Sequence, residues 1–257
     1  MTGVERVVVG GVPVDRLSAK ELTDRLIADW RARRAGDTFA PRISTTVNGQ
    51  VMSLFHTDAA YREAVLAADY VAADGMSVVT GSRLFTRRPL PERVATTDWF
   101  HDAAEAAARH GVGFFLLGAK PDANAKAVQR ALQLHPGLRI VGARNGYFTD
   151  AQLPEVAEEV ARSGADVLWL GVGNPRQALL AHRFKALLPQ LTWVRTCGGL
   201  FDHLSGEHVR APKALQAAGL EWAWRAALEP RRLLWRYATT NAHSAWLMAT
   251  RSERAAG

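Results

Sequence analysis

Short apolar runs alternate with longer amphipathic segments through the second half of the chain. The apolar runs predict buried strands at residues 112–117, 139–143, 167–170 and 192–196. The amphipathic segments predict helices at residues 97–110, 152–162 and 175–187, and one that ends at residue 135. Strands that are apolar on both faces and separated by such helices are typical of a parallel sheet. We therefore predict an α/β fold, with a mostly parallel sheet covered by helices on both faces, of the Rossmann-like type.

The first hundred residues carry a weaker pattern of the same kind. Two short apolar pieces, residues 4–9 and 12–14, flank Gly10 and Gly11 and predict strands joined by a turn. Ser18 with Glu21 three residues later has the capping-box form, which predicts a helix over residues 19–33. Further strands are predicted at residues 43–47 and 70–73, and further helices after Asn48, at 59–68 and at 75–85.

The last fifth of the chain differs in composition from the rest. The 257 residues include 32 basic and 25 acidic side chains, a formal net charge of +7, and residues 208–257 hold eight of the basic and three of the acidic ones. Half of the 8 tryptophans also lie there. We predict an α/β domain over residues 1–207 and a helical, basic appendage over residues 208–257, broken at Pro230.

The excess of positive charge predicts an anionic partner, which can be a nucleic acid, a phosphorylated substrate or an acidic membrane surface. The nucleic-acid interpretation is the weakest of the three, because no recognised DNA-binding or RNA-binding motif accompanies the charge. Tryptophan combined with arginine is the composition of an interfacial membrane contact, but also of a helix packed on its own domain. Both of these interpretations stay open for the appendage.

Cysteine use and the N-terminus indicate the compartment. Cys197 is the single cysteine in the sequence, so it cannot form an intramolecular disulfide. The N-terminus lacks a basic segment followed by an apolar run, and no stretch approaches about 18 uncharged apolar residues. We therefore expect a cytoplasmic protein whose membrane contact, if any, is peripheral.

Two strand-to-helix turns carry glycines and a cation. In the first, Gly171 and Gly173 precede Asn174, which suits a helix N-cap, and Pro175, which suits the first helical position. The second runs from Gly118 through Lys120. Such turns lie at the carboxyl edge of a parallel sheet, where open α/β sheets bind ligands. Each turn, taken alone, is equally consistent with an ordinary strand-to-helix connection. The two turns together favour a ligand that carries phosphate.

Carboxylates at strand ends are the candidates for acid–base chemistry. Asp74 follows a predicted strand and is either an N-cap or a general base. Asp202, after Gly198 and Gly199, is either a turn residue or a ligand-binding carboxylate. The sequence has no Asp-x-Asp pair and its 8 histidines are scattered, so a tight metal site is not expected.

An ordered set of short motifs resembles the WecG/TagA/CpsF glycosyltransferase family and spans roughly residues 4 to 240. Its members are Thr46-Val47-Asn48, Ala73-Asp74-Gly75, Glu92-Arg93-Val94, residues 115–121, Gly171-x-Gly173-x-Pro175-x-Gln177, Gly198-Gly199-x-Phe201-Asp202, Arg210-Ala211-Pro212, residues 219–222 and Glu229-Pro230-x-Arg232. The resemblance implies an inverting transferase that moves a hexosyl unit from a UDP-sugar to a polyprenyl-diphosphate-linked saccharide, in the synthesis of a cell-surface polysaccharide or exopolysaccharide. It also implies work at the inner face of the cytoplasmic membrane, with no cofactor and no essential metal.

The resemblance also implies roles for individual residues. Asp74 corresponds to the catalytic base and Thr46 to its neighbour at the substrate. The substrate-binding residues that the resemblance implies are Asn48, Arg93, Gln177 and Asp202, and the two glycine-containing turns add Gly118, Lys120, Gly171, Gly173 and Asn174. Those that approach the membrane and the diphosphate would be Arg210, Arg225 and Arg232. The oligomeric state is left open, and a homo-oligomer is compatible with all of this.

Two departures from the family pattern concern the donor sugar. Ala178 stands where many members have Glu, and Met76-Ser77 replaces a smaller pair. An N-acetylmannosamine donor is therefore in question, and glucose or a uronic acid stays open. The alternative from another class is a non-catalytic protein that binds a nucleotide sugar or another anionic ligand.

Overall fold

The computed structural model describes residues 3–207, 211–212, 215, 221–228 and 230–253, without the side chains of Arg225 and residues 230–238. Its centre is a six-stranded sheet in the order β4-β3-β8-β7-β5-β6, and every neighbouring pair is parallel. The strands are β3 (Arg42–Val47), β4 (Tyr70–Ala73), β5 (Gly113–Gly118), β6 (Arg139–Arg144), β7 (Val167–Gly171) and β8 (Trp193–Thr196). The predicted parallel α/β sheet is therefore confirmed.

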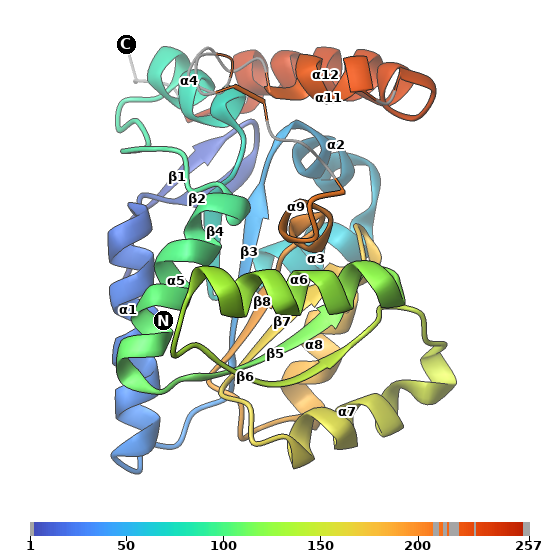
Figure 1. The fold of residues 1–257 in the computed structure, drawn as a ribbon. Coiled ribbons are helices and arrows are strands. Elements are labelled where there is room, and N and C mark those ends of the chain that lie inside the picture. Colours follow the sequence, from blue (N-terminus) through green and yellow to red (C-terminus); the bar gives the residue numbers. More distant parts are fainter. Residues whose placement is uncertain (1–2, 208–210, 213–214, 216–220, 229, 254–257) are drawn as a thin grey trace.

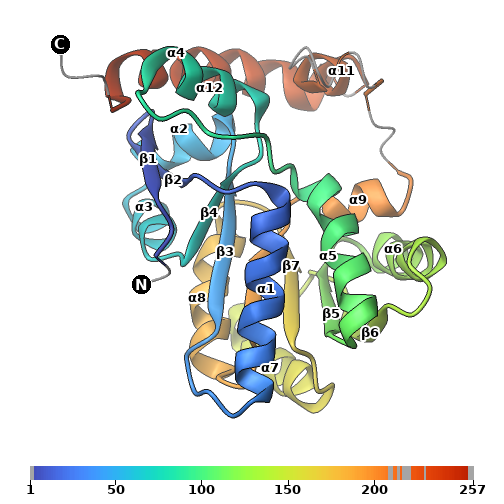
Figure 2. The ribbon, with the colours of Figure 1, turned by 90° about the vertical axis from the view of Figure 1, so that its left-hand side faces the viewer.

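Helices cover both faces of this sheet (Figures 1 and 2). One face, here called the α5 face, packs against α1 (Ala19–Arg34), α5 (Thr96–His110), α6 (Pro121–Leu134) and α9 (Leu200–Leu204). The opposite face, the α8 face, packs against α2 (Gly49–Thr57), α3 (Ala59–Leu66), α7 (Leu153–Arg162) and α8 (Arg176–Leu187). A short 3-10 helix, η1 (Asp150–Gln152), precedes α7. Because alternate side chains of the central strands enter these two cores, β5 (GFFLLG) and β7 (VLWLG) read as almost wholly apolar.

The N-terminal strands form a separate hairpin. β1 (Arg6–Val9) and β2 (Val12–Asp15) pair antiparallel through a turn at Gly10 and Gly11, whose φ angles of 58° and 80° favour glycine. The predicted capping box at α1 is present, with Ser18 and Glu21 each accepting from the other's backbone N–H. The hairpin and the α1 start were thus both readable from sequence.

The C-terminal helices lie across one end of the molecule, beside α4 (Met76–Phe85) (Figure 1). They are α11 (Glu221–Leu228) and α12 (Pro230–Arg251), so the predicted break near Pro230 is confirmed, although α12 is long. α12 contacts α2 and α4, and Gly81 of α4 lies directly against Met248. At its end, the Gly11 N–H donates to the carbonyl of Arg251 at 2.9 Å. The division at residue 207 stays a prediction.

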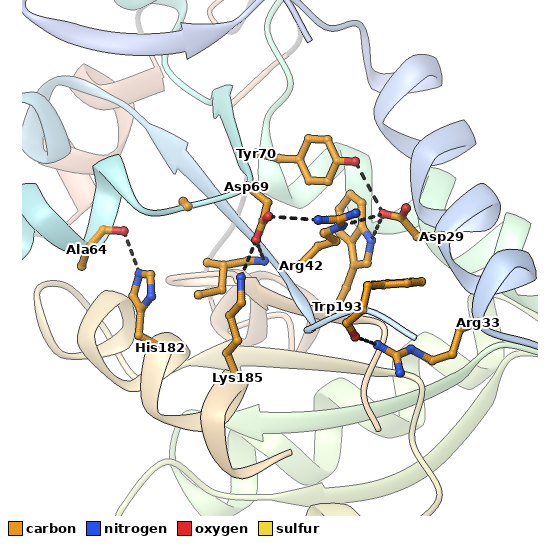
Figure 3. Close-up of polar contacts among 12 residues, drawn as sticks. Asp29, Arg33, Arg42, Ala64, Asp69, Tyr70, His182, Lys185 and Trp193 are labelled. Carbon is orange, nitrogen blue, oxygen red and sulfur yellow. Dashed lines mark hydrogen bonds and ion pairs between the residues drawn. The ribbon is translucent and has the colours of Figure 1, made fainter. Parts of the chain in front are cut away.

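A polar cluster joins the amino ends of three strands, at the end of the sheet where β3, β4 and β8 begin (Figure 3). We call Asp29, Arg42, Asp69 and Lys185 the amino-end cluster. Asp69 accepts from the Ile43 N–H at 2.9 Å, from Lys185 at 2.9 Å and from Arg42 at 3.4 Å. Asp29 accepts from the Trp193 indole at 2.8 Å. These bonds fix the strand starts relative to α1 and α8.

Candidate functional site

Asp74 follows β4 directly and lies at the carboxyl edge of the sheet. Its N–H donates to the carbonyl of Val47 at 2.9 Å, which ties it to the end of β3. Its half-buried side chain belongs to the α5 face by strand alternation, and Oδ1 accepts from the N–H of Thr96 at 3.3 Å. The N-cap of α4 is Gly75, without a side-chain hydrogen bond. The cap interpretation of Asp74 is therefore wrong for α4, and the carboxylate points instead to the first residue of α5.

Charged groups of both signs surround this carboxyl group. Burial raises the pKa of Asp74 above the usual aspartate value. Arg93 and Arg195 oppose the rise because they stabilise the ionised form, as does the Thr96 N–H, whereas Glu221 adds to it. A carboxylate with a raised pKa beside two arginines is the electrostatic setting of many functional aspartates.

Arg93 connects the site to the C-terminal helices. One guanidinium nitrogen donates to Glu221 of α11 at 2.9 Å and another to Asp98 of α5 at 3.4 Å. The Arg93 side chain is only 11% exposed and that of Glu221 is 20% exposed. The predicted site residue Arg93 is thus brought to Asp74, and a residue of the appendage lies in the same cluster.

Arg195 of β8 is a component of the site that sequence reasoning missed. It is fully buried on the α5 face, where it donates to the Ser44 hydroxyl at 2.6 Å and to the Thr96 hydroxyl at 3.2 Å. Its guanidinium lies 4.6 Å from the centre of the Trp99 ring. The available signal was a single charged residue inside a strand predicted to be buried.

Thr46 and Asn48 flank Asp74 from the end of β3. Thr46 pairs with Ala72, two residues before Asp74 on β4. Asn48 is the N-cap of α2, where its side-chain oxygen accepts from the Val51 N–H at 3.1 Å. A Cβ on Gly75 would lie 3.2 Å from the Asn48 Cβ, so these two residues are in close contact. The structure thus gathers Thr46, Asn48 and Asp74, as predicted.

Close packing at the ends of β5 and β7 leaves no room for a side chain at their last residues, which are glycines. Gly118 and Gly171 are paired neighbours. A Cβ on Gly118 would lie 2.4 Å from the Gly171 carbonyl oxygen, and one on Gly171 would lie 2.5 Å from the Phe201 ring. The ring of Phe201 therefore fills the space that side chains here would need. A direct role of these glycines in ligand binding stays a prediction.

The turn after β7 differs from its predicted form. α8 begins at Arg176, its N-cap position is Pro175, and the Asn174–Pro175 peptide bond is cis. The prediction of Asn174 as N-cap and Pro175 as first helical residue differs from the observed start by one residue, although Pro175 already has helical φ and ψ. Gly173, with φ of 84°, is exposed at the turn.

Gln177 and Arg176 of α8 hold neighbouring loops. The buried Gln177 side chain accepts from the Gly198 N–H at 3.2 Å, which links the turn after β7 to the turn after β8. Arg176 donates to the carbonyl of Phe148 and its guanidinium lies 4.6 Å from the centre of that ring. Ala178, the departure from the family pattern, is buried in the core of the α8 face. These residues organise the rim of the sheet's carboxyl edge.

A pocket of about 490 Å³ opens at this rim, lined by residues that include Ala119, Tyr147, Gly171 and Arg176. β5 and β7 are neighbours, but α6 after β5 packs on the α5 face and α8 after β7 packs on the α8 face. Chain connections thus diverge here, which makes it a topological switch point, the place where open α/β sheets bind ligands. Lys120, at the N-cap of α6, is exposed beside the pocket-lining Ala119.

The remaining predicted site residues lie at the margins. Asp202 is in the first turn of α9, 3.6 Å from where a Cβ on Gly199 would be. Arg210 lies outside the described residues, and the side chains of Arg225 and Arg232 do too. Within the described part of the chain, no three His, Cys, Asp or Glu side chains gather so that they could hold a metal ion. In that same part, no helix combines the length and apolar character needed to cross a bilayer.

A parallel α/β sheet covered by helices on both faces, with a pocket at its switch point, defines the class of the protein: a Rossmann-like α/β protein. Residues 7–256 match the model of the WecG/TagA/CpsF glycosyl transferase family. The match covers nearly the whole chain, so the protein belongs to this family and is a glycosyltransferase.

Proposed function

We propose that the protein is an inverting hexosyltransferase. It moves a sugar from a UDP-sugar to a polyprenyl-diphosphate-linked saccharide during synthesis of a cell-surface polysaccharide or exopolysaccharide. The observation that carries the proposal is the carboxyl group of Asp74. Within the described residues it receives one hydrogen bond, from Thr96, although two arginines favour its ionised form. Lone pairs remain for a substrate hydroxyl.

The chemistry needs one base. The Asp74 carboxylate takes the proton of the acceptor hydroxyl while the new bond to the sugar C1 forms, and UDP leaves from the opposite face with the electron pair of the broken bond. Charge that develops on the diphosphate is stabilised by arginines and by amides at helix starts, such as those after β5 and β7. Thr46 and Asn48 orient the sugar and the acceptor beside Asp74.

The pocket at the switch point suits the nucleotide. Tyr147 on its rim is an exposed aromatic ring that offers a flat face to a base. β4 and β7 are three strand spacings apart in the sheet order, about 14 Å. An extended nucleoside diphosphate sugar covers such a span, so a nucleotide in this pocket would place its sugar toward Asp74.

The C-terminal end provides a surface for membrane contact. Large apolar side chains exposed on the neighbouring helices include Leu84 of α4, 70% exposed, and Trp246 of α12, 55% exposed. These helices lie at the same end of the molecule (Figure 2). Exposed leucine and tryptophan beside arginine-rich helices favour peripheral binding to an anionic bilayer, which would bring the site to its lipid-linked acceptor on the cytoplasmic face.

A transfer assay tests the proposal. Purified protein is incubated with single UDP-sugars that include N-acetylmannosamine, glucose and glucuronic acid donors and with a polyprenyl-diphosphate sugar, with and without EDTA. We expect one donor to give product, and EDTA to leave the rate unchanged. Tight UDP binding without product across the panel would instead support a non-catalytic nucleotide-sugar-binding protein.

Vesicle sedimentation tests the membrane part separately. Leu84→Glu should reduce binding to vesicles that contain anionic lipid. Leu187→Glu is the matched control, because Leu187 is 47% exposed but lies at the end of α8, where the chain returns to the amino end of the sheet. Equal binding of both variants and of wild type would rule out a role for the α4 surface.

A further inference from the structure

Arg195 is a buried cation that forms no ion pair with any residue the structure describes. Its side chain is 0% exposed, and within the described residues its hydrogen bonds go to two neutral hydroxyls, those of Ser44 and Thr96. Its Nε is buried and has no hydrogen-bond partner in that part of the chain. A guanidinium can donate five hydrogen bonds, and leaving a buried charge so poorly satisfied is costly. Packing alone would favour an apolar side chain at this position.

The position of Arg195 in the fold raises the energetic cost of its buried positive charge further. Thr96 is the first residue of α5 and Trp99 lies one turn further on, so the guanidinium is beside the positive end of the helix dipole. A nearby negative charge is needed to offset both. Thr96 supplies the link: its hydroxyl accepts from Arg195 while its backbone N–H donates to Asp74.

The other charges around Asp74 do not replace Arg195. Arg93 is bonded to two carboxylates, Glu221 and Asp98, which offset its charge. Cys197, two residues after Arg195 on the chain, stays neutral because burial raises the pKa of its thiol. Of the two arginines near Asp74, Arg195 is therefore the one whose charge is not offset by a bonded carboxylate in the described part of the chain.

We propose that Arg195 is a positioning residue that acts through Thr96: it keeps Asp74 ionised and oriented to receive the proton of the acceptor hydroxyl. The proposal rests on the proposed function of Asp74 as the base. When the carboxylate takes the proton, its attraction to Arg195 is lost, which favours return of that proton to solvent after UDP has left. Arg195 itself stays protonated and touches no substrate.

A titration of Asp74 tests this without any substrate. Protein labelled with ¹³C at aspartate side-chain carboxyls is titrated by NMR, and the Asp74 signal is assigned by its absence in Asp74→Asn. We expect Arg195→Met to raise the titration midpoint of Asp74 by about one pH unit or more. Thr96→Val, which keeps the N–H but removes the hydroxyl, should raise it by a smaller amount.

Thr192→Val is the matched control. Thr192 is also a fully buried threonine, close to Arg195 on the chain, and its hydroxyl has no hydrogen-bond partner among the described residues. Its replacement should leave the Asp74 midpoint unchanged. If Arg195→Met does not fold, the neutral, polar variant Arg195→Gln and Thr96→Val decide the question.

Unchanged midpoints in folded Arg195 and Thr96 variants would overturn the proposal. In the transfer assay, the acidic limb of the pH–rate profile should move with the midpoint. A uniform loss of rate at every pH, with the limb in place, would show a structural role and would also overturn it. A wild type that transfers no sugar would count against the proposed function alone, because the titration remains readable.

Discussion

Asp69 at the amino end of the sheet and Asp74 at its carboxyl end differ in how many hydrogen-bond partners they have. At the amino end, Asp69 accepts from a backbone N–H and from two cations within 3.4 Å. At the carboxyl end, Asp74 accepts one N–H at 3.3 Å, and the two arginines nearby bond to other groups. Both ends join neighbouring strands, but among the described residues Asp69 bonds directly to two cations, whereas Asp74 bonds to neither of its neighbouring arginines.

This difference separates a structural carboxylate from a reactive one. A carboxylate that is fully hydrogen-bonded holds elements together and has little capacity for a substrate. Asp74 is half-buried, under-bonded and attracted by cations at a distance, so it combines a usable lone pair with stabilisation of its charge. The amino-end cluster therefore stabilises the fold, whereas Asp74 is the candidate for chemistry.

Matched substitutions at the two ends should give the largest contrast. Asp74→Asn removes the base, and we expect the transfer rate to fall by about 10²- to 10⁴-fold. Asp69→Asn should leave the rate per folded molecule within about a factor of three, because Asp69 lies at the other end of the sheet. Steady-state assays of both variants check this, and a comparable loss in both would break the distinction.

The effects on stability should have the reverse order, with the larger loss in Asp69→Asn and not in Asp74→Asn. Asp69→Asn leaves the half-buried Lys185 and Arg42 with weaker partners, and we expect it to lower the free energy of unfolding by about 1–3 kcal/mol. Urea denaturation at neutral pH measures the change. An unaltered midpoint would show that the amino-end cluster contributes nothing measurable.

Removing the negative charge beside Arg93 should move the pH dependence. Glu221 raises the pKa of Asp74, so Glu221→Gln should shift the acidic limb of the rate profile to lower pH, by less than about one unit. Glu207→Gln, an exposed glutamate just after α9, serves as the control and should not move the limb. A shift to higher pH in Glu221→Gln would contradict the assigned electrostatics.

The smallest expected effect is the change in protein stability when the ionisable group of Asp74 is removed. Because burial raises the pKa of Asp74 in the folded protein, its ionisation opposes folding, and this penalty develops as pH rises above the unfolded value of about 4. Asp74→Asn should therefore be slightly more stable than wild type at neutral pH, with the difference shrinking toward acid. Thermal unfolding between acid and neutral pH checks this; lower stability of the variant at neutral pH would contradict it.

Much of the fold was predictable because strand and helix periods are local. The apolar runs became β5 to β8, although β6, at the edge of the sheet, is only partly buried, and the Ser18 capping box marked the start of α1. The start of α8 was not predictable in detail, since Asn174 and Pro175 look like a cap and first turn until the path of the chain is known. The short helix α9 was also missed, because five residues carry too little periodic signal.

The candidate site was predictable from two sources. Asp74 was a candidate from its place after a predicted strand, whereas Thr46, Asn48 and Arg93 came from the resemblance to the family. Arg195 and Glu221 come from β8 and α11, and their approach to Asp74 depends on the strand order and on the docking of the C-terminal helices. Such long-range contacts have no local pattern.

The most direct test of the assignment of Asp74 is the pH dependence of a single turnover. Wild type and Asp74→Asn are mixed with the productive donor and acceptor, and the transfer rate is followed from acid to alkaline pH. If Asp74 is the base, the wild-type rate falls tenfold per pH unit on its acidic limb, and the residual rate of Asp74→Asn lacks this limb. The same limb at the same pH in Asp74→Asn would show that another group takes the proton.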